Sequence, residues 1–312
     1  MASPQLNSNT DFGPRPEMEK TLDKGFIGLT QAFAIGIGLI LVSIALVITI
    51  RAWPAISQFG LGFLFNSAWN PVTGREYFGA LPVIYGTLVN SFLALLIAVP
   101  LGIGSAIFLS EDFIPLKIRT VLVFLVELLA AIPSVVYGLW GIFVMIPFLS
   151  SLHKIIPFFP VVRGPSMLVA SVVLAIMILP IIIAISRDSL FALPPDLRQA
   201  SLGLGATRWE TIFRVLIPAA ISGIVGGIML ALGRAMGETM AVTMLIGNSN
   251  RISPSLTQPA NTIASLLANQ FAEASGLQVS ALMYAGLVLM ILTLLVNILA
   301  EIIVNKIKAK YN

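Results

Sequence analysis

Two ionisable side chains, Arg234 and Glu238, lie deep inside a long apolar stretch of the sequence. On a continuous helix, residues four positions apart lie on nearly the same face, about 6 Å apart along the axis. An arginine at mid-bilayer costs about 3 kcal/mol on insertion scales, and pairing with Glu238 would recover part of that cost. The sequence therefore predicts either an ion pair that fixes the rotation of the helix or an anion site on a pathway, in which Glu238 holds Arg234.

Small residues surround Arg234 in the same stretch: Gly223, Gly226, Gly227, Gly233 and Gly237. Because small residues let another helix approach closely, Arg234 is expected to face protein or a water-filled gap rather than lipid. Its planar guanidinium suits a tetrahedral oxyanion, to which it donates two hydrogen bonds.

Glu127 is the remaining deep charge and lies in a different apolar stretch. Ionisable groups inside a membrane are functional candidates by default. Three interpretations stay open for it: a partner for an arginine of this chain, a partner for an arginine of another chain, or a local bond within its own helix.

Other kinds of chemistry lack the residues that they need. The sequence has no cysteine and one histidine, which excludes disulfides and thiolate sites and argues against a zinc cluster. It has no G-x-x-x-x-G-K-[ST] phosphate loop and no Gly-Lys dipeptide. We therefore expect no catalytic residue, no metal site and no cofactor in this chain, and any ATP and Mg²⁺ would be bound by a separate polypeptide.

The composition indicates a polytopic membrane protein. Of 312 residues, 57% are hydrophobic and 10% are charged, with a mean hydropathy of +0.97, whereas an ordinary soluble domain is about 25% charged. A bilayer-spanning helix needs about 20 apolar residues, and six blocks meet that need: 26–50, 79–109, 121–149, 167–185, 218–246 and 281–304. The sequence thus predicts an all-α membrane protein with six transmembrane helices. Pro133, Pro147 and Pro180 are expected to kink or end spans.

The Lys and Arg residues set the expected orientation. With both termini in the cytoplasm, twelve of these residues fall on the cytoplasmic side and five on the other side. The net charge of +4 is explained in the same way, because no basic arm or nucleic-acid-binding motif is present.

The chain divides by composition into four parts. Residues 1–25 form a cytoplasmic N-terminal segment, 26–78 the first transmembrane helix and a long outer loop, 79–305 a core of five transmembrane helices, and 306–312 a cytoplasmic tail. The outer segment between the last two spans has apolar residues at helical spacing over 262–274, which predicts a short helix at the membrane surface.

The inner segment 186–217 joins the fourth and fifth spans. Pro194 and Pro195 are suited to start a helix, Gly203 and Gly205 break it, and a second helix begins at about residue 206. Two amphipathic helices with a glycine joint suit docking into a groove of a cytoplasmic partner, or they lie on the lipid surface.

This segment resembles the EAA motif of binding-protein-dependent ABC importers, whose pattern is E-A-A, three residues, G, nine residues and I-x-L-P. The matching positions carry Gln199, Ala200, Ser201, Gly205, Val215, Ile217 and Pro218. Gln199 stands in place of Glu, and Ser201 in place of Ala. The resemblance implies a coupling helix that sits in a cleft of an ATPase subunit, with Gln199, Ala200, Ser201, Gly205 and Pro218 as ATPase-coupling positions.

A second resemblance is more specific. The string GRAMGETMAV at 233–242, with AWNPV at 68–72 and IYGT at 84–87, resembles phosphate ABC importer permeases, of the PstC type more than the PstA type. The resemblance implies a type I importer permease of the inner (plasma) membrane, with Arg234 and Glu238 as substrate-pathway candidates. Glu127 is added to these candidates because it is the remaining deep charge. It implies four kinds of partner: a PstA-type permease, two PstB-type ATPase subunits, a PstS-type phosphate-binding protein and membrane lipid.

Three alternatives remain at this level. The same machine could carry another oxyanion, such as phosphonate, sulfate or molybdate. A secondary anion transporter or channel would need no ATPase, but the sequence lacks the two matching halves typical of many such proteins. A membrane scaffold that relays phosphate status to a signalling kinase would leave the buried arginine and the coupling segment unexplained.

Overall fold

The computed structural model describes residues 17–72, 74–156 and 160–311, and these form two compact units, Met1–Ile50 and Arg51–Asn312. Residues 1–16 of the predicted N-terminal segment lie outside the described residues. The first unit is the greater part of helix α1 (Glu17–Phe59), whose apolar side chains are largely exposed. A helix that is apolar on all sides is suited to lipid.

The second unit is helical apart from one small hairpin. Its strands β1 (Trp69–Asn70) and β2 (Tyr77–Phe78) pair antiparallel, with Trp69 opposite Phe78. Its helices are α2 (Gly62–Phe65), α3 (Leu81–Ser110), α4 (Leu116–Ala131), α5 (Ser134–Trp140), η1 (Gly141–Met145), α6 (Ile146–Ile155), α7 (Met167–Phe191), α8 (Pro195–Gly203), α9 (Arg208–Thr211), η2 (Ile212–Leu216), α10 (Ile217–Gly237), α11 (Met240–Leu245), α12 (Ile263–Gln270) and α13 (Leu277–Tyr311).

Within the described residues, six helices are long and apolar enough to span a membrane: Lys20–Phe59, Leu81–Ser110, Ser134–Ile155, Met167–Phe191, Arg208–Gly237 and Leu277–Ile302. The prediction of an all-α protein with six membrane helices is confirmed. The predicted tail 306–312 continues α13 as far as Tyr311.

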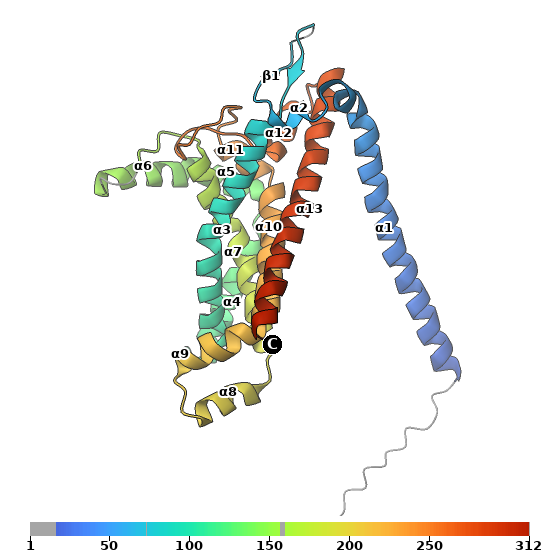
Figure 1. The fold of residues 1–312 in the computed structure, drawn as a ribbon. Helices are drawn as coiled ribbons and strands as arrows, with labels where there is room; N and C mark the ends of the chain where they lie inside the picture. The colour runs from blue at the N-terminus through green and yellow to red at the C-terminus, as the bar shows by residue number, and fades with distance from the viewer. Residues whose placement is uncertain (1–16, 73, 157–159, 312) are drawn as a thin grey trace, which may run out of the picture. The chain divides into compact units, whose positions relative to one another are not determined.

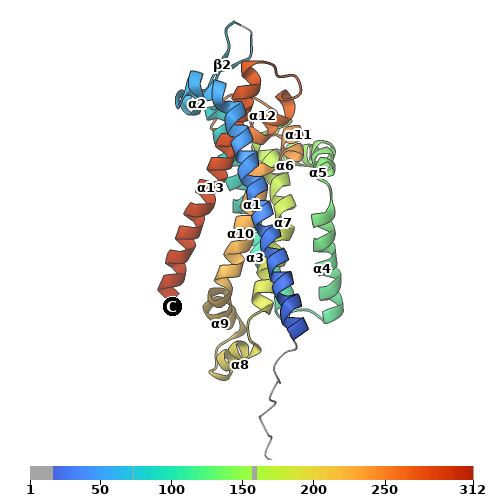
Figure 2. The ribbon, with the colours of Figure 1, turned by 90° about the vertical axis from the view of Figure 1, so that its right-hand side faces the viewer.

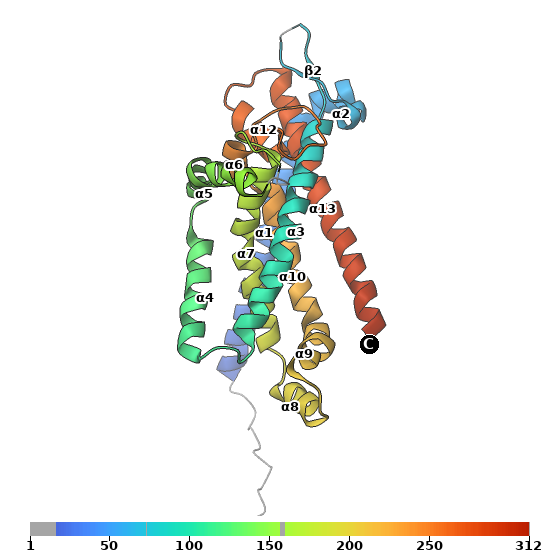
Figure 3. The ribbon, with the colours of Figure 1, turned by 90° about the vertical axis from the view of Figure 1, so that its left-hand side faces the viewer.

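The centre of the second unit is α7, which packs between α3 and α10 (Figure 1). Ala94 and Ala98 of α3 and Val173 and Ile178 of α7 are fully buried in the main apolar core. Figures 2 and 3 place α4 and α13 on opposite sides of this group. Helices α3, α7 and α10 therefore form the frame on which the other elements are held.

The prediction that the third apolar block forms a single helix over 121–149 is wrong. Helix α4 ends at Ala131, Ile132 is extended with ψ 127°, and Pro133 precedes α5. The cause is local, because proline disfavours helical backbone in the residue before it. After this break α5, η1 and α6 turn away from the direction of α4 (Figure 3).

The helix predicted over 262–274 is shorter and is packed differently. Helix α12 covers Ile263–Gln270, and Ile263 and Leu266 are fully buried in a cluster with residues of α3 and α13. The Thr87 hydroxyl of α3 accepts the Ile263 amide at 3.0 Å. Helix α12 is thus seated in the protein rather than on the membrane surface.

Candidate functional site

Helix α10 presents one open face that carries Arg234 in its last turn. The more open positions recur along one side of the helix: Ser222, Gly226, Leu230, Gly233, Arg234 and Gly237. The opposite side carries Leu232 and Met236, which are buried against α3 and α13. The local sequence therefore rotates α10 so that its arginine points away from the core.

The glycines of α10 have two separate roles. A side chain at Gly223 or Gly227 would meet Ser189 or Ile185 of α7, so these two glycines allow the close approach of α10 to α7. At Gly226, Gly233 and Gly237, by contrast, no atom of the described residues outside the adjacent helix backbone lies within 4 Å of the position that a Cβ would take. The glycine stripe expected around Arg234 is therefore partly a packing surface and partly an open wall beside the guanidinium.

The prediction that the fifth apolar block forms one continuous helix over 218–246 is also wrong. Helix α10 ends at Gly237, Glu238 is extended (φ −66°, ψ 123°), and α11 begins at Met240. Glycine is a poor helix former, which favours an end at Gly237. The Thr239 hydroxyl donates to the Gly237 carbonyl at 3.1 Å and thereby satisfies one acceptor at the helix end.

This break removes the geometry predicted for Arg234 and Glu238. Glu238 is 9% exposed, and its carboxylate accepts a hydrogen bond of 3.4 Å from the Ala241 amide, at the N-terminus of α11. An anionic group stabilises that end of a helix. Within the part of the chain that the structure describes, Arg234 has no ion pair.

Tyr137 of α5 lies within electrostatic range of Arg234. Its hydroxyl donates to the Leu129 carbonyl of α4 at 2.9 Å. Leu129 is two residues beyond Glu127, so Tyr137 connects the end of α4 with the surroundings of Arg234.

Glu127 lies on a helix with little cover from its own chain. Among the described side chains of α4 none is buried, and Glu127 itself is exposed. It makes no ion pair with any side chain in the described ranges. An uncompensated carboxylate in hydrocarbon is costly, so Glu127 requires water, a pathway or another protein beside it.

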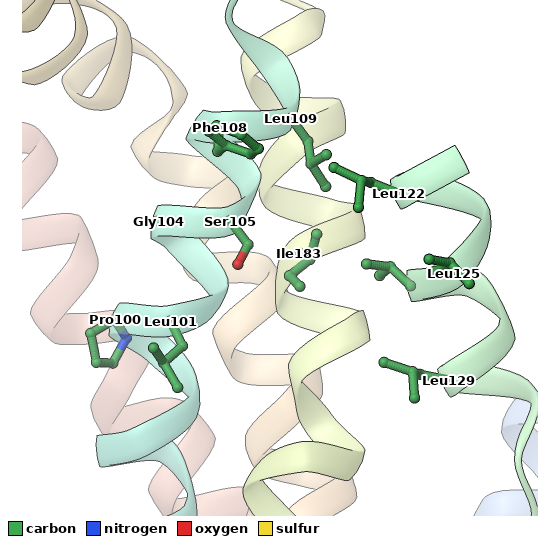
Figure 4. Close-up of a pocket in the computed structure, with 11 residues that line it drawn as sticks. Pro100, Leu101, Gly104, Ser105, Phe108, Leu109, Leu122, Leu125, Leu129 and Ile183 are labelled. Carbon is green, nitrogen blue, oxygen red and sulfur yellow. The ribbon is translucent and has the colours of Figure 1, made fainter. Parts of the chain in front are cut away.

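A cavity of about 530 Å³ separates α4 from α3 and α7 (Figure 4). Leucines and other apolar side chains line it, including Leu101, Leu122 and Leu129, with the Ser105 hydroxyl among them. A hydrated oxyanion needs charged or hydrogen-bonding groups, so this cavity is unsuited to bind one.

The predicted pair of inner helices is present. Helix α8 starts at Pro195 after the cap Pro194, with Asp196 in its first turn. Gly205 has φ +87°, the left-handed conformation that favours glycine and ends the helix.

A capping box then starts α9: the Thr207 side chain and the Glu210 side chain each bond the other residue's backbone amide. A π-helical turn, η2, continues from α9 into α10.

The predicted coupling positions present an exposed surface. Gln199, Ala200 and Gly205 are exposed, and the neighbouring Leu204 is 90% exposed. Ser201 is half-buried and shares a hydrogen bond of 2.9 Å with Thr211, which joins α8 to α9. The fifth position of this set, Pro218, lies in the first turn of α10.

The structure does not bring the predicted pathway residues and the predicted coupling positions together. Helices α8 and α9 lie at the end of the second unit opposite α5, α11 and α12 (Figure 1). Arg234 and Glu238 lie at the far end of α10, next to α11. Helix α10 can therefore transmit a displacement of α8 and α9 at one end to the surroundings of Arg234 at the other, where a passage could open or close.

Residues 98–309, more than half of the chain, match the family described as "Binding-protein-dependent transport system inner membrane component". The chain belongs to this family. It is a multi-pass protein of the inner membrane and a permease subunit.

Curated relatives cover nearly all of the chain. It is 46% identical over 302 residues to the phosphate transport system permease protein PstC of Mesorhizobium japonicum, which covers 92% of this chain and 91% of the relative. It is 43% identical over 294 residues to the protein of the same name from Pasteurella multocida, with 90% and 91% covered.

Solved structures show the same fold at low identity. A bacterial ABC transporter involved in the import of the acidic polysaccharide alginate matches with a TM-score of 0.63 and 17% identity, over 93% of this chain and 99% of that chain. An inward-facing structure of the MetNI methionine ABC transporter matches with a TM-score of 0.53 and 20% identity, over 73% and 94%. The fold of an ABC importer permease is thereby confirmed.

The sequence did not reveal one group of paired charged residues. Glu111 and Asp112, in the turn between α3 and α4, contact arginines of α4, α8 and α9. The signal was two adjacent acidic residues at the end of an apolar block, but their partners are as many as 96 positions away.

Proposed function

We propose that this chain is the permease subunit of an ATP-driven importer of inorganic phosphate. The observation that carries the proposal is the similarity, over about nine tenths of the chain, to permeases named for phosphate transport. The open face of α10 agrees with it, because an exposed arginine beside three unobstructed glycines offers hydrogen-bond donors to a tetrahedral anion.

In this proposal three further kinds of subunit complete the machine. A homologous PstA-type permease forms the pathway together with this chain. Two PstB-type ATPase subunits bind ATP and Mg²⁺ and grip the coupling helices of the two permeases, which in this chain are α8 and α9. A PstS-type protein delivers phosphate on the opposite side of the membrane. Both termini lie in the cytoplasm, as the distribution of Lys and Arg favours.

Arg234 attracts the anion and releases it again in this scheme. A pathway site must bind its cargo weakly enough to let it leave, so tight binding belongs to the soluble protein. ATP binding and hydrolysis shift the populations of inward-facing and outward-facing states. We assign Glu127 to the surface that faces the second permease or the pathway, because α4 lacks buried residues.

Reconstituted transport tests the proposal directly. Proteoliposomes would hold this chain with its candidate permease and ATPase partners, and the binding protein would be added outside with phosphate, sulfate or phosphonate. Stimulated ATP hydrolysis and uptake with phosphate alone are expected. Stimulation by another oxyanion would keep the ABC mechanism and change the cargo, whereas phosphate flux through liposomes that hold this chain alone would favour a channel or secondary transporter.

A further inference from the structure

Three arginines from three helices converge on the short turn between α3 and α4. Arg119 of α4 donates to the Asp112 carboxylate and to the Glu111 carbonyl, each at 2.9 Å. Arg198 of α8 donates to the Glu111 carboxylate at 3.0 Å and 3.2 Å, through Nη2 and Nε. Arg208 of α9 donates to the Asp112 carbonyl at 3.4 Å. The turn is thus bonded to both helices of the coupling segment.

The ion pair between Arg198 and Glu111 is the strongest of these links between separate parts of the chain. The two side chains are only 24% and 17% exposed, so water screens the pair less than it screens an exposed pair. Arg198 also donates to the Leu190 carbonyl at the end of α7, at 3.0 Å. One guanidinium therefore joins α8, the last turn of α7 and the α3–α4 turn.

Apolar contacts support the same junction. The Phe113 ring lies 5.6 Å from the Trp209 ring of α9, centroid to centroid, and the Arg208 guanidinium lies 5.9 Å from the Phe113 centroid. Beneath the turn, Ile107 of α3 and Leu190 of α7 are buried in one cluster with residues of η2 and α10. The turn and the coupling segment are packed as one body.

Along the covalent backbone, the coupling segment is joined directly to α7 and α10 and to no other helix. Residues 192–194 join α7 to α8, and η2 joins α9 to α10. Helices α3 and α4 reach this segment only through contacts across the chain, such as the Glu111–Arg198 pair, whose members are 87 positions apart.

We propose that Glu111 is a positioning residue for coupling, which acts through Arg198 to make the α3–α4 turn follow every displacement of α8. A movement of α8 then reaches α3 and α4 together with α7 and α10, so the frame of the permease moves as a unit. The proposal rests on the proposed function, because it takes α8 as the element that the ATPase displaces.

The first test removes the charges singly in the full reconstituted complex. Glu111→Gln and Arg198→Gln are compared with Arg198→Lys, which retains a positive charge. The readout is phosphate taken up per ATP hydrolysed. Asp188→Asn is the matched control, because Asp188 pairs with its neighbour Arg187 at the same end of α7 and that pair joins no two elements.

The expected result is a loss of coupling without loss of assembly. Phosphate per ATP is expected to fall about tenfold in both glutamine variants, in line with the loss of a charge-assisted hydrogen bond. Arg198→Lys is expected to keep most of the coupling, and Asp188→Asn all of it. Wild-type coupling in Glu111→Gln would overturn the positioning role alone, whereas a wild-type complex that takes up no phosphate would overturn the proposed function.

A cross-link keeps the test decisive where the single variants do not assemble. The natural chain has no cysteine, so Glu111→Cys with Arg198→Cys supplies the only two thiols of this subunit. A reducible bis-methanethiosulfonate linker, of about the same length as the ion pair, then joins the two cysteines in place of that pair. The cross-linked complex is expected to couple as the wild type does and to lose coupling about tenfold on reduction. Equal coupling before and after reduction would overturn the proposal.

Discussion

Arg234 and Glu238 are four residues apart, yet the end of α10 lies between them. The Glu238 carboxylate accepts the Ala241 amide of α11, and the Arg234 guanidinium lies on the open face of α10. Glu238 therefore stabilises the second helix segment rather than neutralising the arginine. The charge of Arg234 is left for an anion or for a neighbouring subunit to compensate.

The first prediction concerns the charge of Arg234. Arg234→Ala is expected to lower phosphate uptake at least about tenfold, because it removes donors that bind the anion with charge-assisted hydrogen bonds. Arg234→Lys keeps the charge without the planar fork and is expected to retain part of the uptake. Uptake by proteoliposomes is the measurement, and Arg187→Ala, at the other end of the bundle, is the control. Wild-type uptake by Arg234→Ala would remove this residue from the mechanism.

The second prediction separates the two possible roles of Glu238. Glu238→Gln keeps an oxygen that accepts the Ala241 amide, so it is expected to leave uptake and thermal stability nearly unchanged. Glu238→Ala removes the acceptor and is expected to cost about 1 kcal/mol, as the loss of a helix cap does. Thermal inactivation of the purified complex and uptake are measured together. Equal damage by both variants would instead indicate that the negative charge itself is required.

Hydropathy predicted the number of spans and missed two breaks within them. Residues on both sides of Pro133 are apolar, and the short polar stretch around Gly237 is flanked by apolar residues on both sides, so an average over a window of span length stays high across each break. Pro133 does end α4, whereas Pro180 lies inside the continuous helix α7. Proline disfavours helical backbone in the residue before it at both positions, so this local preference alone does not predict which of the two prolines ends a helix.

Helices α8 and α9 were predictable because their signals are local. Pro195, Asp196 and Gly205 act on their own backbone or on the nearest helix turn. As predicted, Pro195 and Asp196 lie in the first turn of α8 and Gly205 lies just after its end. The Glu111–Arg198 pair was not predictable, since no local spacing relates residues on two helices that meet only through the tertiary fold. The same applies to the open face of α10, which depends on how α3, α7 and α13 cover its other sides.

The third prediction concerns the seat of the outer segment on α3. A Cβ at Gly86 would overlap the backbone carbonyl oxygen of Asn261, and no change of rotamer relieves a clash with backbone. Gly86→Ala is therefore expected to destabilise the complex by about 2 kcal/mol, in the range of overpacked sites. Gly104→Ala is the control on the same helix, because its Cβ would meet nothing within 4 Å. Thermal inactivation midpoints of the two variants are compared, and equal values would contradict the close approach at Gly86.

The fourth prediction concerns Glu127. If this side chain faces the second permease or the pathway, Glu127→Leu lowers uptake severalfold although it removes a carboxylate whose insertion costs about 3 kcal/mol. If it faces lipid, the same variant inserts more readily and transports as the wild type does. Phe124→Leu, at another exposed position of α4, is the control. Membrane abundance and uptake are measured on the same samples, and unchanged uptake by Glu127→Leu would place the residue outside the pathway.

The fifth prediction uses the conformation of Gly205. Its φ of +87° disfavours most side chains, while the space around its Cβ position is open. Gly205→Asn is expected to be tolerated, because asparagine enters the left-handed region more readily than other residues do. Gly205→Trp adds a bulky ring to an exposed surface and is expected to reduce the ATPase subunit that co-purifies and its stimulation by loaded binding protein.

Gly203→Ala separates these effects from a general disturbance of the segment. Gly203 is the last residue of α8 and its Cβ position is also open, but its φ is not positive. Alanine is therefore expected there without loss of ATPase binding. The comparison of the tryptophan variant with the asparagine variant then isolates bulk from backbone strain. If assembly and stimulated ATP hydrolysis both survive Gly205→Trp, the ATPase does not dock at this joint, and the assignment of α8 and α9 as the coupling segment is wrong.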